Sequence, residues 1–165
     1  MSLFNRRKVL TALCLTSVLG SCGFTPIYSD GSAASDLQGR IEVTAGKGRE
    51  SFEMREHMIE RFGFAKNAKY NLSYTYFSES EGLAVSTSAE ITRYNLDGIS
   101  SFKVTDTTSG AVVFSGVVKS KTAYSATSET YPTRVAEQDA QSRLALALAE
   151  QIITRVSATA TQWAK

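Results

Sequence analysis

The last third of the chain carries an apolar stripe that constrains the fold more than any other feature of the sequence. The stripe repeats every four residues and consists of Leu144, Leu148, Ile152 and Val156, flanked by Ala145, Ala149 and Ile153. This spacing predicts an amphipathic helix, and Tyr131-Pro132-Thr133 can begin it because proline is tolerated in a first helical turn. The apolar face is wide enough to cover one face of a β-sheet.

Alternation of apolar and polar residues predicts the strands. Four segments are expected to be extended: 40–44, 70–76, 83–106 and 111–126. Ser78-Glu79-Ser80-Glu81-Gly82 is expected to interrupt the chain between the second and third of them. Thr107-Thr108-Ser109-Gly110 is expected to form the turn before the last strand.

The dipeptide Asp97-Gly98 leaves two interpretations of the long third segment. Asp-Gly often marks a tight hairpin, which would divide the segment into two strands. The apolar residues on both sides of Gly98 nevertheless keep one parity, as a continuous strand requires; they are Tyr94, Leu96, Phe102 and Val104. We therefore favour one long strand with a bulge or kink at Gly98.

A shorter helix is expected after the first strand. Ser51 can cap its start, Glu53 suits the positive first turn, and Gly63 can end it in a left-handed conformation. Its expected apolar stripe is Phe52, Met58, Ile59 and Phe62. The resulting order, βαβββα, predicts an α+β two-layer sandwich with two helices packed on one face of a mixed or antiparallel sheet.

The N-terminus has the pattern of a bacterial export signal. The cationic Asn5-Arg6-Arg7-Lys8 precedes a mainly apolar stretch of 11 residues, 9–19, which is too short to span a ~30 Å hydrocarbon core. Leu19-Gly20-Ser21-Cys22 then matches the lipobox, in which Cys22 is acylated and becomes the mature N-terminus. The alternatives are an ordinary cleaved signal or a buried first helix, and Arg6-Arg7 faintly resembles a twin-arginine signal.

Processing at Cys22 predicts four regions along the chain. They are a lipoprotein signal peptide (1–21), a lipidated N-terminus and tether (22–39), an α+β domain (40–160) and a tail (161–165). Acyl chains contribute about 0.8 kcal/mol per buried CH₂, so two or three give a stable membrane anchor. Gly23 stands where an aspartate would favour retention at the inner membrane, which predicts the periplasmic side of the outer membrane.

The net charge of +2 belongs to the export signal. Without Arg6, Arg7 and Lys8 the chain has 15 basic residues against 16 acidic ones, a formal charge of −1. A near-neutral body lacks the basic stripe that nucleic-acid binding needs. Two cysteines and one histidine are also too few for a Cys/His zinc site. We therefore expect no nucleic-acid partner, no metal and no cofactor.

Groups that could carry catalysis have simpler explanations. His57 is the only imidazole, is expected to be solvated on a helix face, and has no GxSxG motif to accompany it. Glu79 and Glu81 flank an expected turn, where solvated acids are usual. Gly46-Lys47-Gly48 lacks the spacing of a phosphate-binding loop and is expected to be a turn. No catalytic residue is expected.

Basic residues on the long strands are the remaining candidates for ligand contact. Arg93, Lys119 and Lys121 could guard a sheet edge against aggregation. In a periplasmic lipoprotein they could instead meet lipid phosphates through charge-assisted hydrogen bonds. The sequence leaves both roles open.

The segment Cys22-Gly23-Phe24-Thr25-Pro26-Ile27-Tyr28 resembles the start of the lipopolysaccharide-assembly lipoprotein family (LptE). The βαβββα order, the alanine- and leucine-rich closing helix and Ala89-Glu90-Ile91-Thr92-Arg93-Tyr94 are similar to that family too, and the tail with Trp163 falls outside the resemblance. The resemblance implies a plug that assists folding of an outer-membrane β-barrel (LptD type) and binds lipopolysaccharide. It also implies basic contacts at the sheet end, for which Arg93 is the best match, followed by Lys119 and Lys121.

Two other classes of function remain open at this stage. One is a substrate-binding accessory lipoprotein of a phospholipid or ABC-type transport system, against which the Gly-Phe-x-Pro-x-Tyr start counts. The other is a peptidoglycan or lipid hydrolase, which would have to use His57 as its base.

Overall fold

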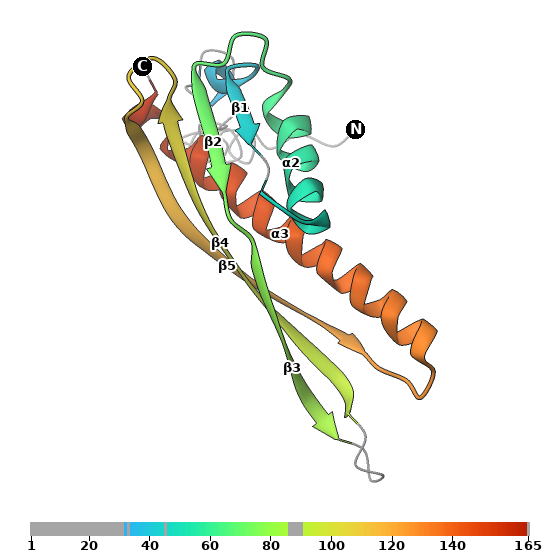
Figure 1. Ribbon diagram of the computed structural model, residues 1–165. Helices are drawn as coiled ribbons and strands as arrows, with labels where there is room; N and C mark the ends of the chain where they lie inside the picture. The colour runs from blue at the N-terminus through green and yellow to red at the C-terminus, as the bar shows by residue number, and fades with distance from the viewer. Residues whose placement is uncertain (1–31, 33, 45, 86–90, 165) are drawn as a thin grey trace, which may run out of the picture.

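The computed structural model describes residues 32, 34–44, 46–85 and 91–164 (Figure 1). Within these residues the chain forms a short 3₁₀ helix, five strands and two α-helices. They are η1 (Ser35–Leu37), β1 (Ile41–Thr44), α2 (Arg49–Phe62), β2 (Tyr70–Tyr74), β3 (Phe77–Val85), β4 (Ile91–Asp106), β5 (Val112–Ser125) and α3 (Thr130–Trp163).

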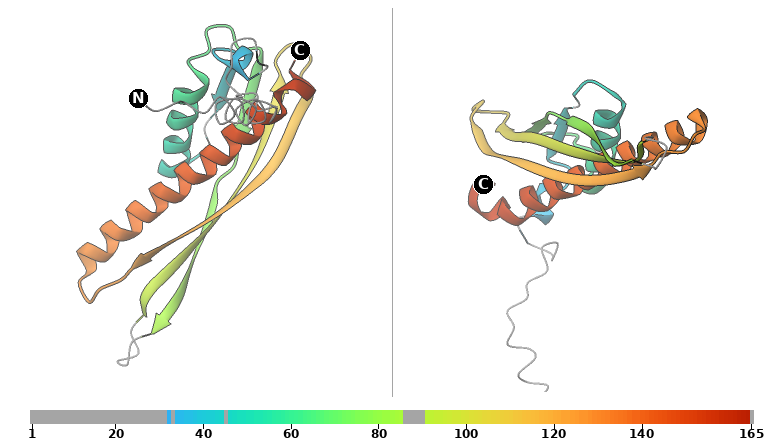
Figure 2. Two further views of the ribbon diagram at one scale, coloured as in Figure 1. Left: turned by 180° about the vertical axis from the view of Figure 1, so that it is seen from behind. Right: turned by 90° about the horizontal axis from the view of Figure 1, so that it is seen from below.

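Strand β4 is the centre of the sheet. One of its edges pairs with β5, and the other pairs first with β3 and then, further along, with β2, all antiparallel. Strand β1 extends the sheet beyond β2 in parallel orientation, so the sheet is mixed. Both helices lie on the same face of this sheet (Figure 2). The predicted α+β sandwich is thereby confirmed.

The closing helix buries the stripe that the sequence predicts. Its residues Leu144, Leu148, Ile152 and Val156 are fully buried against the sheet. Proline at position 132 lies in the first turn, as expected. This helix supplies a large share of the hydrophobic core, because its apolar face covers β4 and β5 along much of their length.

The folded region extends past both expected domain boundaries. Helix α3 continues through residue 160 to Trp163, whose indole stacks on Phe114 with ring centroids 6.2 Å apart and meets Tyr70 edge-on at 5.1 Å. At the other end, Ala34 and Leu37 are buried although they lie in the range assigned to a tether. Aromatic stacking and apolar burial therefore draw parts of the expected tether and tail into the core.

The expected interruption at residues 78–82 is wrong, because this segment belongs to strand β3. Serine, glutamate and glycine have low strand propensity, yet β3 pairs residue by residue with β4 from Phe77 opposite Ile99 to Gly82 opposite Tyr94, beyond which the register shifts. The long third strand accordingly begins at Ile91 rather than at 83, and residues 86–90 lie outside the described part of the chain. Pairing with a neighbour outweighs local propensity here.

Strand β4 runs without interruption through Asp97 and Gly98, which confirms the continuous-strand interpretation. The expected bulge is absent at this point, since Gly98 lies in regular register between Ser78 and Ser120. The glycine is instead required for helix packing. A Cβ on Gly98 would lie 2.9 Å from the side chain of Leu144, so its absence lets α3 approach the strand closely.

The expected stripe of helix α2 is confirmed at Met58 and Phe62, with Ile59 partly buried beside them, and is wrong at Phe52. The helix begins at Arg49, directly after Gly48, so Ser51 is a buried residue inside the helix and not its cap. The buried face is Ser51, Met54, Met58 and Phe62, while Phe52 is 57% exposed. More than one face of this helix carries apolar side chains, and packing against β1 and α3 determines which face is buried. Gly63 ends the helix as expected, with φ 78° and its N–H donating to the carbonyl of Ile59 at 2.8 Å.

Candidate functional site

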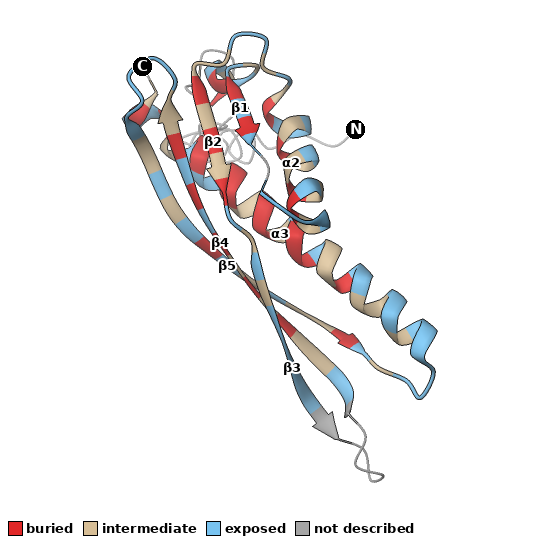
Figure 3. Ribbon diagram, viewed as in Figure 1, coloured by how far each residue is buried: buried red, intermediate tan, exposed pale blue. Residues whose placement is uncertain are grey.

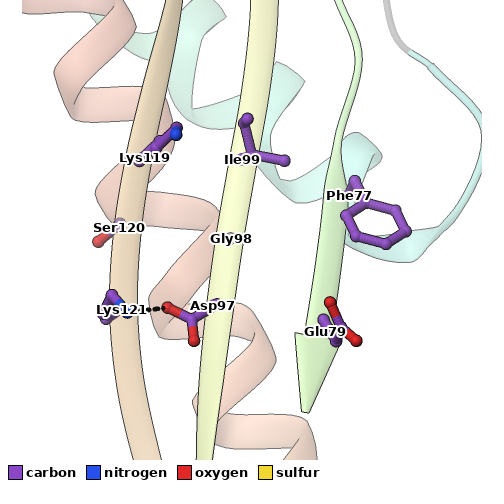
Figure 4. Close-up of a pocket in the computed structure, with 8 residues that line it drawn as sticks. All are labelled: Phe77, Glu79, Asp97, Gly98, Ile99, Lys119, Ser120 and Lys121. Carbon is purple, nitrogen blue, oxygen red and sulfur yellow. Dashed lines mark ion pairs between the residues drawn. The ribbon is translucent and has the colours of Figure 1, made fainter. Parts of the chain in front are cut away.

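The face of the sheet opposite the helices contains a hollow of about 510 Å³ that spans three strands. Figure 4 looks onto this hollow with α3 behind the strands. Strand β3 contributes Phe77 and Glu79, β4 contributes 97–99, and β5 contributes 119–121. Buried residues concentrate where the helices cover the sheet, whereas the described residues of β3 are exposed or intermediate (Figure 3). The hollow is therefore open to ligands on a surface that no helix covers.

Strand register places the side chains of this hollow in two rows. One row runs Lys119, Ile99, Phe77 and is apolar except at the β5 end. The next row runs Lys121, Asp97, Glu79 and is charged throughout. Alternation explains why these residues share a face, since Leu96 and Ser100, between which they lie on β4, are buried toward the helices.

The charges in the hollow are balanced in number, and two of the four form an ion pair. Lys121 Nζ lies 2.7 Å from Asp97 Oδ1, and this hydrogen bond and the carboxylate charge raise the pKa of Lys121. Neither Lys119 nor Glu79 forms an ion pair within the described chain. The hollow thus has a free cation on its β5 side and a free carboxylate on its β3 side.

The structure brings together two of the three predicted basic residues. Lys119 and Lys121 line the same hollow. Arg93 lines a separate hollow of about 320 Å³, together with Tyr124 of β5 and Arg143 of α3. Arg93 lies four residues before Asp97 on β4, and strand register places it opposite Ser125, beyond the end of the first hollow. Cys22, the predicted lipid-anchor residue, lies outside the described residues.

The free edge of β5 bears on the two roles that the sequence left open for the lysines. Side chains of α3 satisfy backbone carbonyls along this edge: Gln151 Nε2 donates to Lys119 O at 3.0 Å, and Arg155 Nη1 donates to Val117 O at 2.8 Å. The helix therefore protects the edge itself. Lys119 and Lys121 project from the open face, so their side chains are available to a ligand.

His57 is not the solvated residue that the sequence suggested. Its Nε2 lies 2.6 Å from Glu150 Oε1 on α3, and Arg61 Nη2 approaches the other carboxylate oxygen at 3.6 Å. The imidazole therefore connects the two helices and lies on the opposite side of the sheet from the hollow. Tertiary packing created this contact, because the residues are 93 positions apart.

Sequence reasoning missed Phe77, Asp97 and Glu79 as parts of one surface. The sequence predicts a turn at Glu79 and includes Phe77 neither in the strand before it nor in that turn. Residues 78–82 are polar or glycine throughout, so the segment has no apolar–polar alternation that would indicate a strand. Only the tertiary structure shows its pairing with β4.

Two further properties concern the described residues as a whole. No described helix is long and apolar enough to cross a membrane. Among the same residues, no group of three or more histidine, cysteine, aspartate or glutamate side chains is arranged to hold a metal ion.

Comparison with solved structures relates this fold to bacterial lipoproteins. A protein assigned as a lipoprotein from Caulobacter crescentus CB15 superimposes with a TM-score of 0.64 at 21% identity, over 78% of this chain and 96% of that one. Rare lipoprotein B from Shewanella oneidensis gives 0.58 at 12% identity, over 74% and 95%. A minor lipoprotein from Acinetobacter baumannii gives 0.55 at 17% identity, over 72% and 89%.

These likenesses establish the fold. No protein-family model matches the sequence, and no curated protein matches it either. The chain thus has the α+β fold of these lipoproteins, and the similarity covers nearly the whole length of each solved structure.

Proposed function

We propose that this protein is an outer-membrane lipoprotein, anchored through Cys22 on the periplasmic side, that plugs and assists the folding of the lipopolysaccharide-assembly β-barrel (LptD type). In this proposal it also binds lipopolysaccharide on its way to the outer leaflet, and it has no catalytic role. The partners are then the barrel, the glycolipid and, through the acyl chains, the membrane.

One agreement carries the proposal. The lipobox and the following Gly-Phe-x-Pro-x-Tyr segment lie at the start of a chain whose fold is that of three solved lipoproteins. These observations are independent, since the first is read from residues 19–28 and the second rests on the described domain. The open sheet face, with Lys119 and Lys121 projecting from it, supports the lipid-binding part.

The barrel partner can be tested by affinity purification of the tagged protein from detergent-extracted outer membranes. A large β-barrel protein is expected to co-purify in stable proportion. A Cys22→Ser variant provides the control for the anchor, because it should lose membrane attachment while the domain still folds. Recovery of a transport ATPase complex in place of a barrel would contradict the proposal and favour the accessory-lipoprotein alternative.

The glycolipid contact can be tested with variants that follow the observed geometry. Lys119→Gln/Lys121→Gln removes both cations of one hollow, and Arg93→Gln removes the cation of the other. Binding of purified lipopolysaccharide should fall in the triple variant. Comparison of Lys119→Gln/Lys121→Gln with Arg93→Gln should show which hollow contributes more. Unchanged binding in the triple variant would favour the alternative role of all three residues, which is to guard the sheet edge against aggregation.

A further inference from the structure

The open-face hollow has a charge pattern that is unusual for a simple anion site. Two lysines on β5 face two carboxylates, Asp97 on β4 and Glu79 on β3. A ligand with only negative charge would be attracted by the lysines and repelled by the carboxylates beside them. A ligand with both signs of charge would meet a complementary partner on each side.

The dimensions of the sheet set the spacing of those partners. Adjacent strands lie about 4.8 Å apart, so β5 and β3 are separated by roughly 10 Å across β4. The central Lys121–Asp97 pair, at 2.7 Å, satisfies itself and leaves Lys119 and Glu79 as the free ends of this arrangement (Figure 4). A phosphate and an ammonium joined by a short linker can lie between two such long side chains.

An apolar row lies directly beside the charged one. Ile99 and Phe77 are neighbours across β4 and β3, and Phe77 is 61% exposed although it is a large aromatic side chain. Covering this row with an alkyl chain would remove apolar surface from water, at about 25 cal/mol per Å². The hollow therefore combines a dipolar charge pattern with a small apolar surface.

We infer that the β3–β4–β5 hollow binds a zwitterionic amphiphile, in which a phosphate and a primary ammonium share a short linker and carry an alkyl chain. Lys119 contacts the phosphate, Glu79 contacts the ammonium, and Ile99 and Phe77 contact the chain, while Lys121 stays paired with Asp97. Phosphoethanolamine groups on phospholipids or glycolipids have this chemistry. The inference rests on the lipid-binding part of the proposed function and does not depend on the barrel partner.

The test is titration of the full-length protein, purified in a maltoside detergent, with three probes. They are dihexanoyl phosphatidylethanolamine, dihexanoyl phosphatidylglycerol with the same chains but no ammonium, and O-phosphoethanolamine with no chains. Backbone amide shifts of Gly98 and Ser120 report binding in the hollow. The ethanolamine lipid is expected to bind at least about fivefold more tightly than the glycerol lipid and than the free headgroup.

Variants assign the contacts. Glu79→Gln should abolish the preference for the ethanolamine lipid, whereas Lys119→Gln should weaken both lipids. Glu42→Gln is the matched control, because Glu42 is also an exposed strand carboxylate but lies on β1, away from the hollow. Equal binding of the two lipids, or equal effects of Glu79→Gln and Glu42→Gln, would overturn the inference.

The two proposals fail in different ways. Loss of the lipid preference with an intact barrel complex would remove this inference alone. Specific ethanolamine-lipid binding without any barrel partner would leave this inference standing and remove the barrel proposal.

Discussion

Leu144 of α3 packs directly onto the backbone of Gly98 in the central strand. A Cβ on Gly98 would lie 2.9 Å from Leu144 Cγ and Cδ2 and 3.0 Å from Cδ1. Real side chains essentially never approach a Cβ this closely, and the leucine is fully buried and cannot move freely. The close approach of helix to sheet therefore depends on this glycine.

Gly98→Ala should destabilise the protein. The added methyl group overpacks the contact with Leu144, which typically costs about 1–3 kcal/mol. The free energy of unfolding, measured by urea denaturation, should fall by that amount. In a Leu144→Ala background the same substitution should be neutral or stabilising, because the clash is gone and alanine is favoured over glycine in a strand. An equal loss in both backgrounds would contradict the packing explanation.

Stability should decline at alkaline pH because of Tyr74. Burial raises the pKa of Tyr74 from 10.0 to about 12, and the nearby Arg55 charge lowers it in part. The protonated phenol, which donates a hydrogen bond to the Ser51 carbonyl, is thus favoured in the folded state. Its contribution is complete below pH 10 and is lost as pH rises towards 12, by roughly 2–3 kcal/mol.

Urea denaturation across this pH window checks the prediction. Tyr74→Phe should lose about 1 kcal/mol below pH 10 through the missing hydrogen bond, and should decline less steeply above it. Burial also raises the pKa values of Tyr76 and Tyr124, so some decline should persist. Tyr131→Phe, at an exposed tyrosine, is the control and should keep the wild-type profile.

Trp163 should contribute strongly to stability although it stands near the end of the chain. The indole is 9% exposed, contacts Tyr70 and Phe114, and donates Nε1–H to Thr159 Oγ1 at 3.1 Å. Trp163→Ala should lower the free energy of unfolding by about 3 kcal/mol. The neighbouring Gln162→Ala, at an exposed position, should change it by less than about 0.5 kcal/mol. Similar values for both would show that the helix end contributes little to stability.

His57 should be dispensable for function. Its contact with Glu150 is partly exposed, so His57→Ala should cost at most about 1 kcal/mol. Glu150→Gln, which weakens the same contact without changing the histidine, should give a similar small loss. Complementation in cells should remain intact for both variants at normal protein levels. Loss of function in His57→Ala alone, with protein levels intact, would support a catalytic imidazole and contradict the non-enzymatic proposal.

Local periodicity accounts for what could be predicted. The four-residue spacing from Leu144 to Val156 and the alternation around Leu96 and Phe102 both persist in the structure, because one face of each element is buried. Gly63 likewise ends its helix, since the left-handed conformation there requires no partner outside the local chain. Such signals depend on neighbouring residues and survive tertiary packing.

Other features depended on distant residues. Strand β3 buries none of its described residues, so its sequence carries no burial pattern, and its extended form comes from pairing with β4. Helix α2 has apolar residues on more than one face, and only contacts with β1 and α3 bury Met54 and leave Phe52 exposed. The predicted stripe is therefore right at Met58 and Phe62 but includes Phe52 in place of Met54.

The sequence by itself determined the class of fold, the continuity of the central strand through Gly98 and the three basic residues worth testing. Only the tertiary structure decided that Lys119 and Lys121 share a hollow with Glu79, while Arg93 lies apart. The physical reason is strand register. Alternation assigns each residue to a face, but hydrogen-bonded pairing between separate strands decides which side chains stand beside one another.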